Sequence, residues 1–107
     1  MTSSLKEKQL IPGIANEYGK QILNLFHPFP KGASLILFGS RAKGNYREGS
    51  DIDLALQGPS MTQKDRTLWL LQYEDLNLPW KLDLVIFKEI EEPALIEHIR
   101  RVGIKLL

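Results

Sequence analysis

Two aspartates, Asp51 and Asp53, are the residues of this sequence whose types and spacing most clearly permit chemistry. They alternate with apolar residues in the segment 51–56, a pattern typical of a β-strand, so both carboxylates would lie on one strand face. Neighbouring carboxylates repel one another and raise each other's pKa unless a cation neutralises them. The spacing therefore predicts a divalent-cation site. The alternative is a solvated edge strand that carries two surface acids.

A third aspartate, Asp83, interrupts the apolar segment 82–87, which has the length and composition of another strand. With oxygen ligands and no His or Cys in these motifs, the set favours Mg²⁺, or Mn²⁺ as the alternative, over zinc. We interpret Asp51, Asp53 and Asp83 as ligands of a two-metal site for phosphoryl chemistry. A surface ion pair between Asp83 and Lys81 is the competing interpretation for the third acid.

The turn Gly39-Ser40 directly follows the apolar run 35–38 and precedes the acidic pair. A glycine after a strand lets the backbone approach a phosphate closely, and a short helix starting at Ser40 would direct free N–H groups toward it. Arg41 and Lys43 lie close by in sequence and could neutralise triphosphate oxygens. The turn is therefore a predicted phosphate site, although a solvated basic loop is the favoured interpretation for Lys43.

These motifs together resemble a known signature. Residues 38–44, Phe-Gly-Ser-Arg-Ala-Lys-Gly, followed by Ser-Asp-Ile-Asp-Leu at 50–54, look like the signature of the DNA polymerase β-like nucleotidyltransferase superfamily. The short length and the Gly-Ser-Arg-Ala form resemble in particular the minimal nucleotidyltransferases, which often act as antitoxins beside HEPN-domain toxins. Segment 82–87 resembles the strand of the third carboxylate, so the resemblance covers most of the chain.

The resemblance implies a reaction and a role for each motif residue. An acceptor hydroxyl would attack the α-phosphorus of a nucleoside triphosphate such as ATP, and pyrophosphate would leave. It implies nucleotide binding by Gly39, Ser40 and Arg41, and catalysis with metal binding by Asp51, Asp53 and Asp83.

The acceptor is not specified by these residues. Relatives that act on tRNA, primers or antibiotics carry further domains to hold the acceptor, and 107 residues leave no room for one. We therefore expect transfer of AMP to a hydroxyl of a partner protein, a HEPN-domain toxin, with this chain as the antitoxin. The alternatives are a small molecule or an RNA end as acceptor, and a non-catalytic antitoxin that occludes its partner.

The elements that must position these residues are readable from apolar spacing and turn residues. We expect a mixed α/β (α+β) fold with a small mixed β-sheet and helices packed against it, the polymerase β-like nucleotidyltransferase fold. A Thr62–Asp65 capping box predicts a helix of about 14 residues, with Leu68, Leu71 and Leu76 indicating its apolar pattern. The other expected elements are helices at 14–26, at Ser40 and from Glu91–Pro93 to just before Gly103, and strands at 35–38, 51–56 and 82–87.

Composition sets the wider limits. A chain of 107 residues suits a single domain, here residues 1–107, and the net charge of +1 comes from dispersed basic residues, with no sign of duplex nucleic-acid binding. There is no cysteine, no signal-peptide pattern at the N-terminus and no apolar run of membrane-spanning length, so we expect no membrane association and a cytoplasmic protein.

Several conspicuous side chains receive no predicted role. His27 lies in a Pro-rich turn and His98 on what looks like a polar helix face, and neither is assigned to catalysis. Trp69 and Trp80 are expected in the core or an interface. Tyr46, between the two motif halves, could approach a base or an acceptor.

Overall fold

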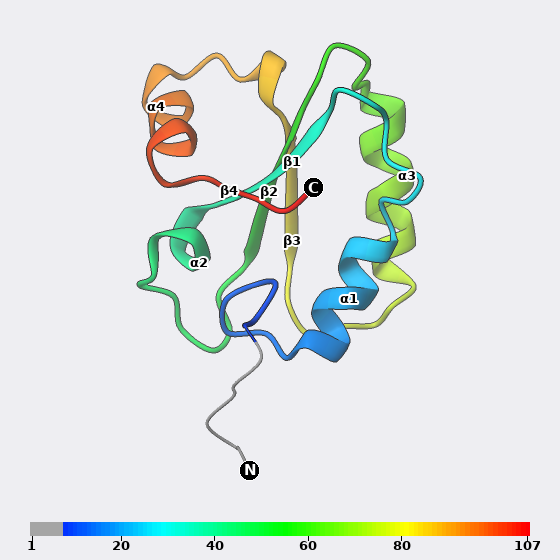
Figure 1. The fold of residues 1–107 in the computed structure, drawn as a ribbon, viewed down its shortest axis with the longest axis vertical. Coiled ribbons are helices and arrows are strands. Elements are labelled where there is room, and N and C mark those ends of the chain that lie inside the picture. Colours follow the sequence, from blue (N-terminus) through cyan, green and yellow to red (C-terminus); the bar gives the residue numbers. More distant parts are fainter. Residues whose placement is uncertain (1–7) are drawn as a thin grey trace.

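The computed structural model describes residues 8–107 and contains one sheet with helices on both sides (Figure 1). The N-terminal residues 1–7, to which the prediction about a signal peptide applies, lie outside the described residues. The elements in chain order are α1 (Asn16–Asn24), β1 (Ser34–Phe38), α2 (Gly39–Lys43), β2 (Ile52–Gln57), α3 (Gln63–Glu74), β3 (Leu82–Ile86), the 3₁₀ turn η1 (Phe87–Glu89), α4 (Pro93–Val102) and β4 (Ile104–Lys105).

The sheet is mixed, as predicted, with the strand order β3-β2-β1-β4. Strand β1 runs antiparallel to both β2 and β4, whereas β2 and β3 are parallel. Parallel neighbours need a crossover connection, and α3 supplies it between β2 and β3. The short strand β4 was not predicted from the sequence, because two residues carry too little apolar alternation to indicate a strand.

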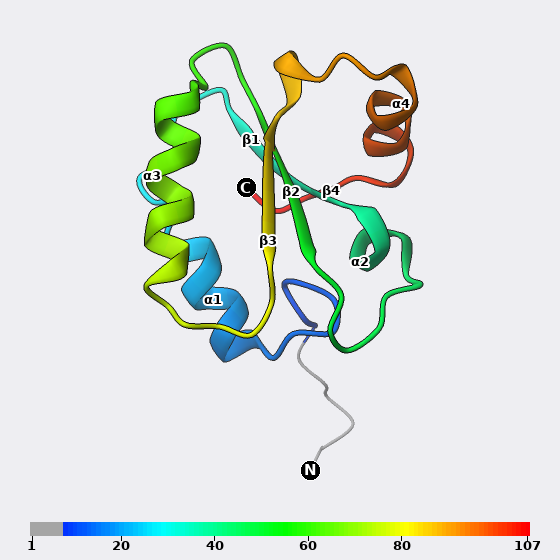
Figure 2. The same cartoon turned by 180° about the vertical axis from the view of Figure 1, so that it is seen from behind.

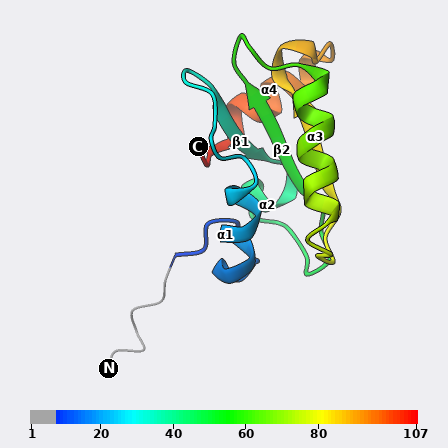
Figure 3. The same ribbon diagram turned by 90° about the vertical axis from the view of Figure 1, so that its right-hand side faces the viewer.

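One face of the sheet carries the main hydrophobic core, which α1 and α3 cover. Figure 2 shows these two helices together on one side of the strands, and Figure 3 views the molecule from that side. Alternate residues of β1, β2 and β3 point into this core, because successive side chains of a strand point to opposite faces of the sheet. The fully or nearly fully buried strand residues are Leu35, Leu37, Ile52, Leu54, Leu56, Leu82, Leu84 and Ile86.

The opposite face of the sheet lies under α2 and α4 and is divided into an apolar part and an acidic part. Phe38, Ala55 and the α4 residue Ile99 form a small second core beside Val85. Register places Phe38 beside Asp53, and residues directly opposite each other in a ladder share a face. Asp53 therefore lies at the end of this apolar patch, on the α2 side.

The buried side of helix α3 differs from the apolar face predicted from the sequence. The Thr62–Asp65 capping box is present, and the helix has 12 residues. However, Leu68 and Leu71 are 50% and 54% exposed. Trp69 instead packs on the rings of Phe26 and Phe29, which follow α1, so the side of α3 that carries Trp69 faces the core.

The other predicted elements are confirmed with small shifts of their ends. The first helix is shorter than predicted, strand β3 gives way to η1 after Ile86, and Pro93 and Gly103 bound α4. Trp69 and Trp80 both pack against the core, as predicted. No helix among residues 8–107 is both long and apolar enough to cross a membrane.

Candidate active site

Register brings two of the three predicted catalytic aspartates together. Asp53 on β2 lies directly beside Asp83 on the parallel strand β3. Asp51 precedes β2, and the adjacent Ile52 N–H donates to the Lys81 carbonyl at 2.9 Å, which ties the start of β2 to the start of β3. Asp53 is half-buried, whereas Asp51 and Asp83 are exposed. Asp53 and Asp83 thus lie side by side, with Asp51 two residues before Asp53.

The Asp53 carboxyl experiences the electrostatic conflict that the sequence predicts. Burial raises its pKa most, and the negative charges of Asp83 and then Asp51 raise it further. The positive charge of Arg41 lowers the pKa of the same carboxyl by a smaller amount. A carboxylate in this position is therefore stabilised by any additional cation that reaches it.

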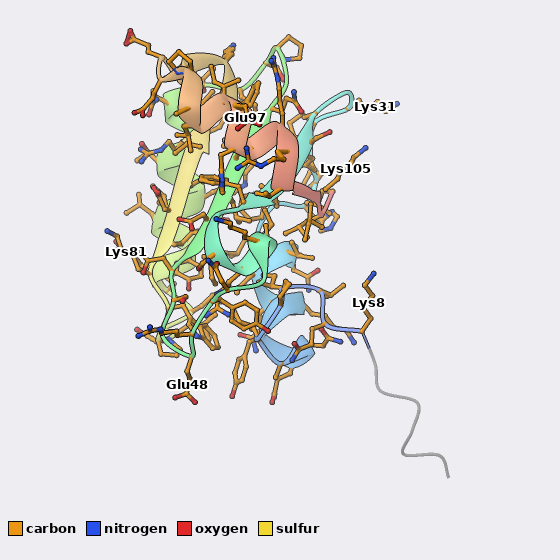
Figure 4. The ribbon with its side chains drawn as sticks, turned by 90° about the vertical axis from the view of Figure 1, so that its left-hand side faces the viewer. Lys8, Lys31, Glu48, Lys81, Glu97 and Lys105 are labelled. Atoms are coloured by element: carbon orange, nitrogen blue, oxygen red, sulfur yellow. The ribbon has the colours of Figure 1, made fainter. Side chains whose placement is uncertain are left out.

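The competing interpretation of Asp83 as an ion-pair partner is not supported. Lys81 is exposed and forms no ion pair with Asp83 in the described part of the chain. Figure 4 shows the Lys81 side chain directed outward from the start of β3. Asp83 is therefore available to a ligand.

The donor set fits Mg²⁺ as a partly protein-bound ion. Within residues 8–107, no three His, Cys, Asp or Glu side chains form a ready-made ligand cluster. Mg²⁺ is usually held by one or two carboxylates, with water and substrate phosphates completing its octahedral shell. Asp53 with a neighbouring acid meets that requirement, because Asp83 lies beside it in the sheet and Asp51 is near enough to act on its carboxyl.

The glycine turn lies directly against the acidic pair. Gly39 has a φ of +73°, a left-handed conformation that glycine adopts without strain. A Cβ at this position would collide with Oδ2 of Asp53. Helix α2 begins here, one residue before the predicted start at Ser40. The glycine is thus required both by its backbone conformation and by its contact with an aspartate of the site.

Arg41 has a different position from the one expected of a phosphate ligand. Its side chain is only 1% exposed. Nε and Nη2 donate to the Ser50 carbonyl at 3.2 and 2.8 Å, and Nη1 donates to the Pro12 carbonyl at 2.8 Å. Nη2 also lies 3.3 Å from the Glu48 carbonyl oxygen, to which it donates. The guanidinium is therefore engaged with main-chain carbonyls.

The Arg41 contacts fix the loop that carries the chain into β2. The guanidinium lies 5.3 Å from the ring centroid of Tyr46, a cation–π distance. Ser50, whose carbonyl accepts two of the Arg41 hydrogen bonds, immediately precedes Asp51. Tyr46, considered from the sequence as a contact for a base or an acceptor, instead stacks on this arginine. Lys43 and Arg47 are exposed, as a solvated basic loop requires.

His98 belongs to the site, although it received no role in the sequence analysis. Its Nε2 accepts a hydrogen bond from the Gly39 N–H at 3.0 Å. Its ring packs edge-on against Phe38, with centroids 6.2 Å apart and planes at 81°. No sequence motif surrounds His98, and 59 residues separate it from Gly39. On a helical wheel His98 shares a face with Leu95 and Val102, and this apolar spacing is a signal that could have suggested a partly buried position.

The nucleotidyltransferase domain family matches residues 20–106, and the chain belongs to that family. This defines the protein as a nucleotidyltransferase. A relative from Methanocaldococcus jannaschii, named a protein adenylyltransferase, is 25% identical over 96 residues, covering 87% of this chain and 95% of the relative.

Solved structures support the same fold. A toxin–antitoxin complex with AMP-PNP matches with a TM-score of 0.62 and 22% identity, over 82% of this chain and 71% of that one. A complex of a tri-AMPylated HEPN toxin from Shewanella oneidensis with an MNT antitoxin matches with a TM-score of 0.57 and 20% identity, over 82% and 67% of the two chains. The predicted minimal nucleotidyltransferase fold is thereby confirmed.

Proposed function

We propose that this protein transfers AMP from ATP to a hydroxyl of a partner protein, in a Mg²⁺-dependent reaction. We further propose that the partner is a HEPN-domain toxin and that the modification makes this chain its antitoxin. The observation that carries the enzymatic part is the placement of Asp53 between Asp83 and Gly39. That arrangement supports the proposal, because it brings the proposed metal ligands and the proposed phosphate turn close together.

The site residues divide into a nucleotide part and an acceptor part. Gly39 and Ser40 would bind the triphosphate, because the glycine lets the backbone come close to phosphate oxygens. Asp51 and Asp53 would hold Mg²⁺ with those oxygens. Asp83, on the open side of β3, would complete the site next to the acceptor hydroxyl. For Arg41 we propose a positioning role through the 44–50 loop in place of a phosphate contact.

The proposed reaction is a single in-line displacement. The acceptor oxygen forms a bond to the α-phosphorus while the bond from that phosphorus to the pyrophosphate oxygen breaks. The acceptor hydroxyl loses its proton to water, and pyrophosphate carries away the electron pair of the broken bond. When bound, Mg²⁺ supplies charge neutralisation for the attacking and leaving oxygens. The three carboxylates contribute by fixing where that charge neutralisation occurs.

A protein acceptor is favoured by the shape of the site and by the relatives. Asp51 and Asp83 are exposed, so the surface of a second molecule can reach them. The curated relative carries the name of a protein adenylyltransferase, and one matching complex contains an AMPylated HEPN toxin. A partner protein would supply the acceptor surface.

The test is a transfer assay with α-labelled ATP, Mg²⁺ and a HEPN-domain protein encoded beside this chain. We expect label on the toxin with the wild-type protein, and a loss of at least about 100-fold for Asp53→Asn or Asp83→Asn, since each would weaken the site that holds the Mg²⁺ needed in the transition state. Asp75→Asn is the matched control, because Asp75 is an exposed acid at the end of α3.

The outcomes separate the alternatives. Label on a small molecule or an RNA end, and none on the toxin, would identify a different acceptor. Neutralisation of the toxin by the Asp53→Asn protein as complete as by wild type would favour occlusion without catalysis. Equal labelling by wild type and both site variants would contradict the assignment of the acids.

A further inference from the structure

The amide of Gly39 is held from outside its own turn. The Gly39 N–H donates to Nε2 of His98 at 3.0 Å, so α4 is hydrogen-bonded to the residue at which β1 ends and α2 begins. Figures 1 and 2 both show α2 and α4 on the same side of the sheet. The bond joins the C-terminal helix to the turn on which the proposed triphosphate binding depends.

The histidine is itself fixed in place. It is half-buried, its ring packs edge-on against Phe38, and the next residue, Ile99, is anchored in the second core. An imidazole nitrogen accepts a hydrogen bond only when it carries no proton, so Nε2 presents its lone pair to Gly39. The packing therefore aims an acceptor at one particular amide.

The hydrogen bond between Gly39 and His98 matters because it restrains a glycine. A glycine has more backbone freedom than any other residue and no side chain that could restrain it. On one side, Gly39 touches the carboxylate of Asp53, which excludes a Cβ. On the other side, the His98 bond fixes the peptide plane between Phe38 and Gly39. Ser40 follows directly, so its direction depends on that plane.

We propose that His98 is a positioning residue, which holds the Gly39-Ser40 turn in the conformation that receives the triphosphate. This inference rests on the proposed function, in that the turn is taken to bind ATP. His98 itself does not contact the reacting atoms. It reduces the conformational freedom that the turn would otherwise lose on binding nucleotide, a general route to higher affinity.

Two substitutions separate the hydrogen bond from the packing. His98→Phe keeps a ring against Phe38 and removes the acceptor, whereas His98→Gln removes the ring and keeps an acceptor oxygen. The matched control is His27→Phe, because His27 is an exposed histidine in the turn that follows α1, away from Gly39. Thermal unfolding of each variant identifies any general loss of fold.

The first measurement is binding of AMP-PNP with Mg²⁺ by calorimetry, together with hydrogen exchange at the Gly39 amide by NMR. For His98→Phe we expect about three- to tenfold weaker binding, the range that one hydrogen bond supports, and faster exchange at Gly39. His98→Gln should recover part of both effects. In steady-state transfer, KM for ATP should rise more than kcat falls, because the lost hydrogen bond weakens nucleotide binding. Partial unfolding would instead lower kcat alone.

The results distinguish failure of this proposal from failure of the proposed function. If wild type binds AMP-PNP and transfers AMP while His98→Phe matches it in affinity, KM and Gly39 exchange, the positioning role is overturned and the function stands. If wild type binds no nucleotide, the proposed function fails and this inference fails with it. Weaker binding by His98→Gln than by His98→Phe would show that ring packing, and not the acceptor, is what matters.

Discussion

At the scale of single residues, Asp53 is both the least favourably placed acid of the site and the one best placed to hold a cation. It is the half-buried member of the three acids, and it lies against Gly39 on one side and Asp83 on the other. Burial and like charge both oppose its ionisation. A residue in such a position reduces the stability of the metal-free protein, and a bound cation would reverse that effect.

The Asp53→Asn variant should therefore be more stable than wild type near neutral pH without Mg²⁺. Because the pKa of Asp53 is raised in the folded protein above its ordinary value of 3.8, the stability contributed by this group is full below that value. It is lost as the pH rises through the higher folded pKa. We expect a gain of no more than about 1 kcal/mol, since solvent screens a half-exposed charge.

Urea unfolding of the Asp53→Asn and wild-type proteins at a series of pH values between about 4 and 7.5 checks this expectation. The difference in free energy of unfolding should shrink as the pH falls toward 4 and should also shrink when Mg²⁺ and ATP are added. Asp75→Asn provides the baseline for removing an exposed acid. A site variant that is less stable than wild type at neutral pH would contradict the electrostatic interpretation.

Arg41 makes a separate prediction, because its buried guanidinium satisfies several carbonyl groups at once. Lysine carries the same charge but lacks the planar set of donors, so Arg41→Lys should leave carbonyls at Ser50 or Pro12 without partners. We expect a loss of about 2 kcal/mol or more in free energy of unfolding. Arg47→Lys, in the exposed part of the same loop, should change it by less than about 0.5 kcal/mol.

Chemical denaturation measures both arginine variants. Transfer activity measured on the folded fraction of Arg41→Lys should also fall, because the loop that leads into Asp51 loses its anchor. Equal stabilities for the two variants would show that the carbonyl contacts of Arg41 contribute little.

The residue types of the site were predictable, and some of their contacts were not. Three aspartates in or directly before apolar strands and a Gly-Ser turn stand out because each is unusual in its context. Arg41 and His98 form hydrogen bonds with main-chain groups. Nearly every residue has the same carbonyl and amide, so the sequence does not indicate which of them is the partner. Their partners are also set by tertiary packing, with 59 residues between His98 and Gly39. Such contacts become visible only when the helices are placed on the sheet.

At the scale of elements, the beginning of α3 illustrates where local rules succeed. Thr62 Oγ1 accepts from the Asp65 N–H at 3.2 Å, and Asp65 Oδ2 accepts from the Thr62 N–H at 3.1 Å. These reciprocal bonds depend only on residues three apart, so the sequence predicts them directly. The buried side of the same helix depends on Phe26 and Phe29, which the local pattern does not include.

The cap gives a prediction at this scale. Thr62→Ala removes the side-chain acceptor for the Asp65 amide and should lower the free energy of unfolding by about 1 kcal/mol. Thr67→Ala is the control, because Thr67 is an exposed residue inside α3 and alanine favours a helix. Thermal and urea unfolding measure both variants. A larger loss for Thr67→Ala than for Thr62→Ala would contradict the capping role.

At the scale of the whole molecule, a hydrogen bond between α3 and the segment before β3 makes the stability of the fold depend on alkaline pH. The Tyr73 hydroxyl at the end of α3 donates to the Trp80 carbonyl at 2.6 Å, just before β3. Burial raises the pKa of Tyr73 from 10.0 to about 12. The stability that this group provides is therefore full below pH 10 and is lost as the pH rises through about 12.

Tyr73→Phe should lose about 1 kcal/mol of stability at neutral pH, the net value of one hydrogen bond. Above pH 10 the stability of wild type should fall more steeply than that of the variant, so the two curves converge. Tyr18→Phe is the control, since Tyr18 is 37% exposed and packs edge-on against Trp80. Parallel curves for wild type and Tyr73→Phe across pH 9 to 11.5 would show that Tyr73 ionisation is not coupled to unfolding.

The two sides of the sheet are free to diverge at different rates during evolution. The large core under α1 and α3 contains none of the three acids, the glycine turn or the histidine that contacts it. A descendant could therefore replace Asp53 and lose its chemistry while it keeps its shape. It would still present the same surface to a partner, so an inactive paralogue could compete with the active protein for one target.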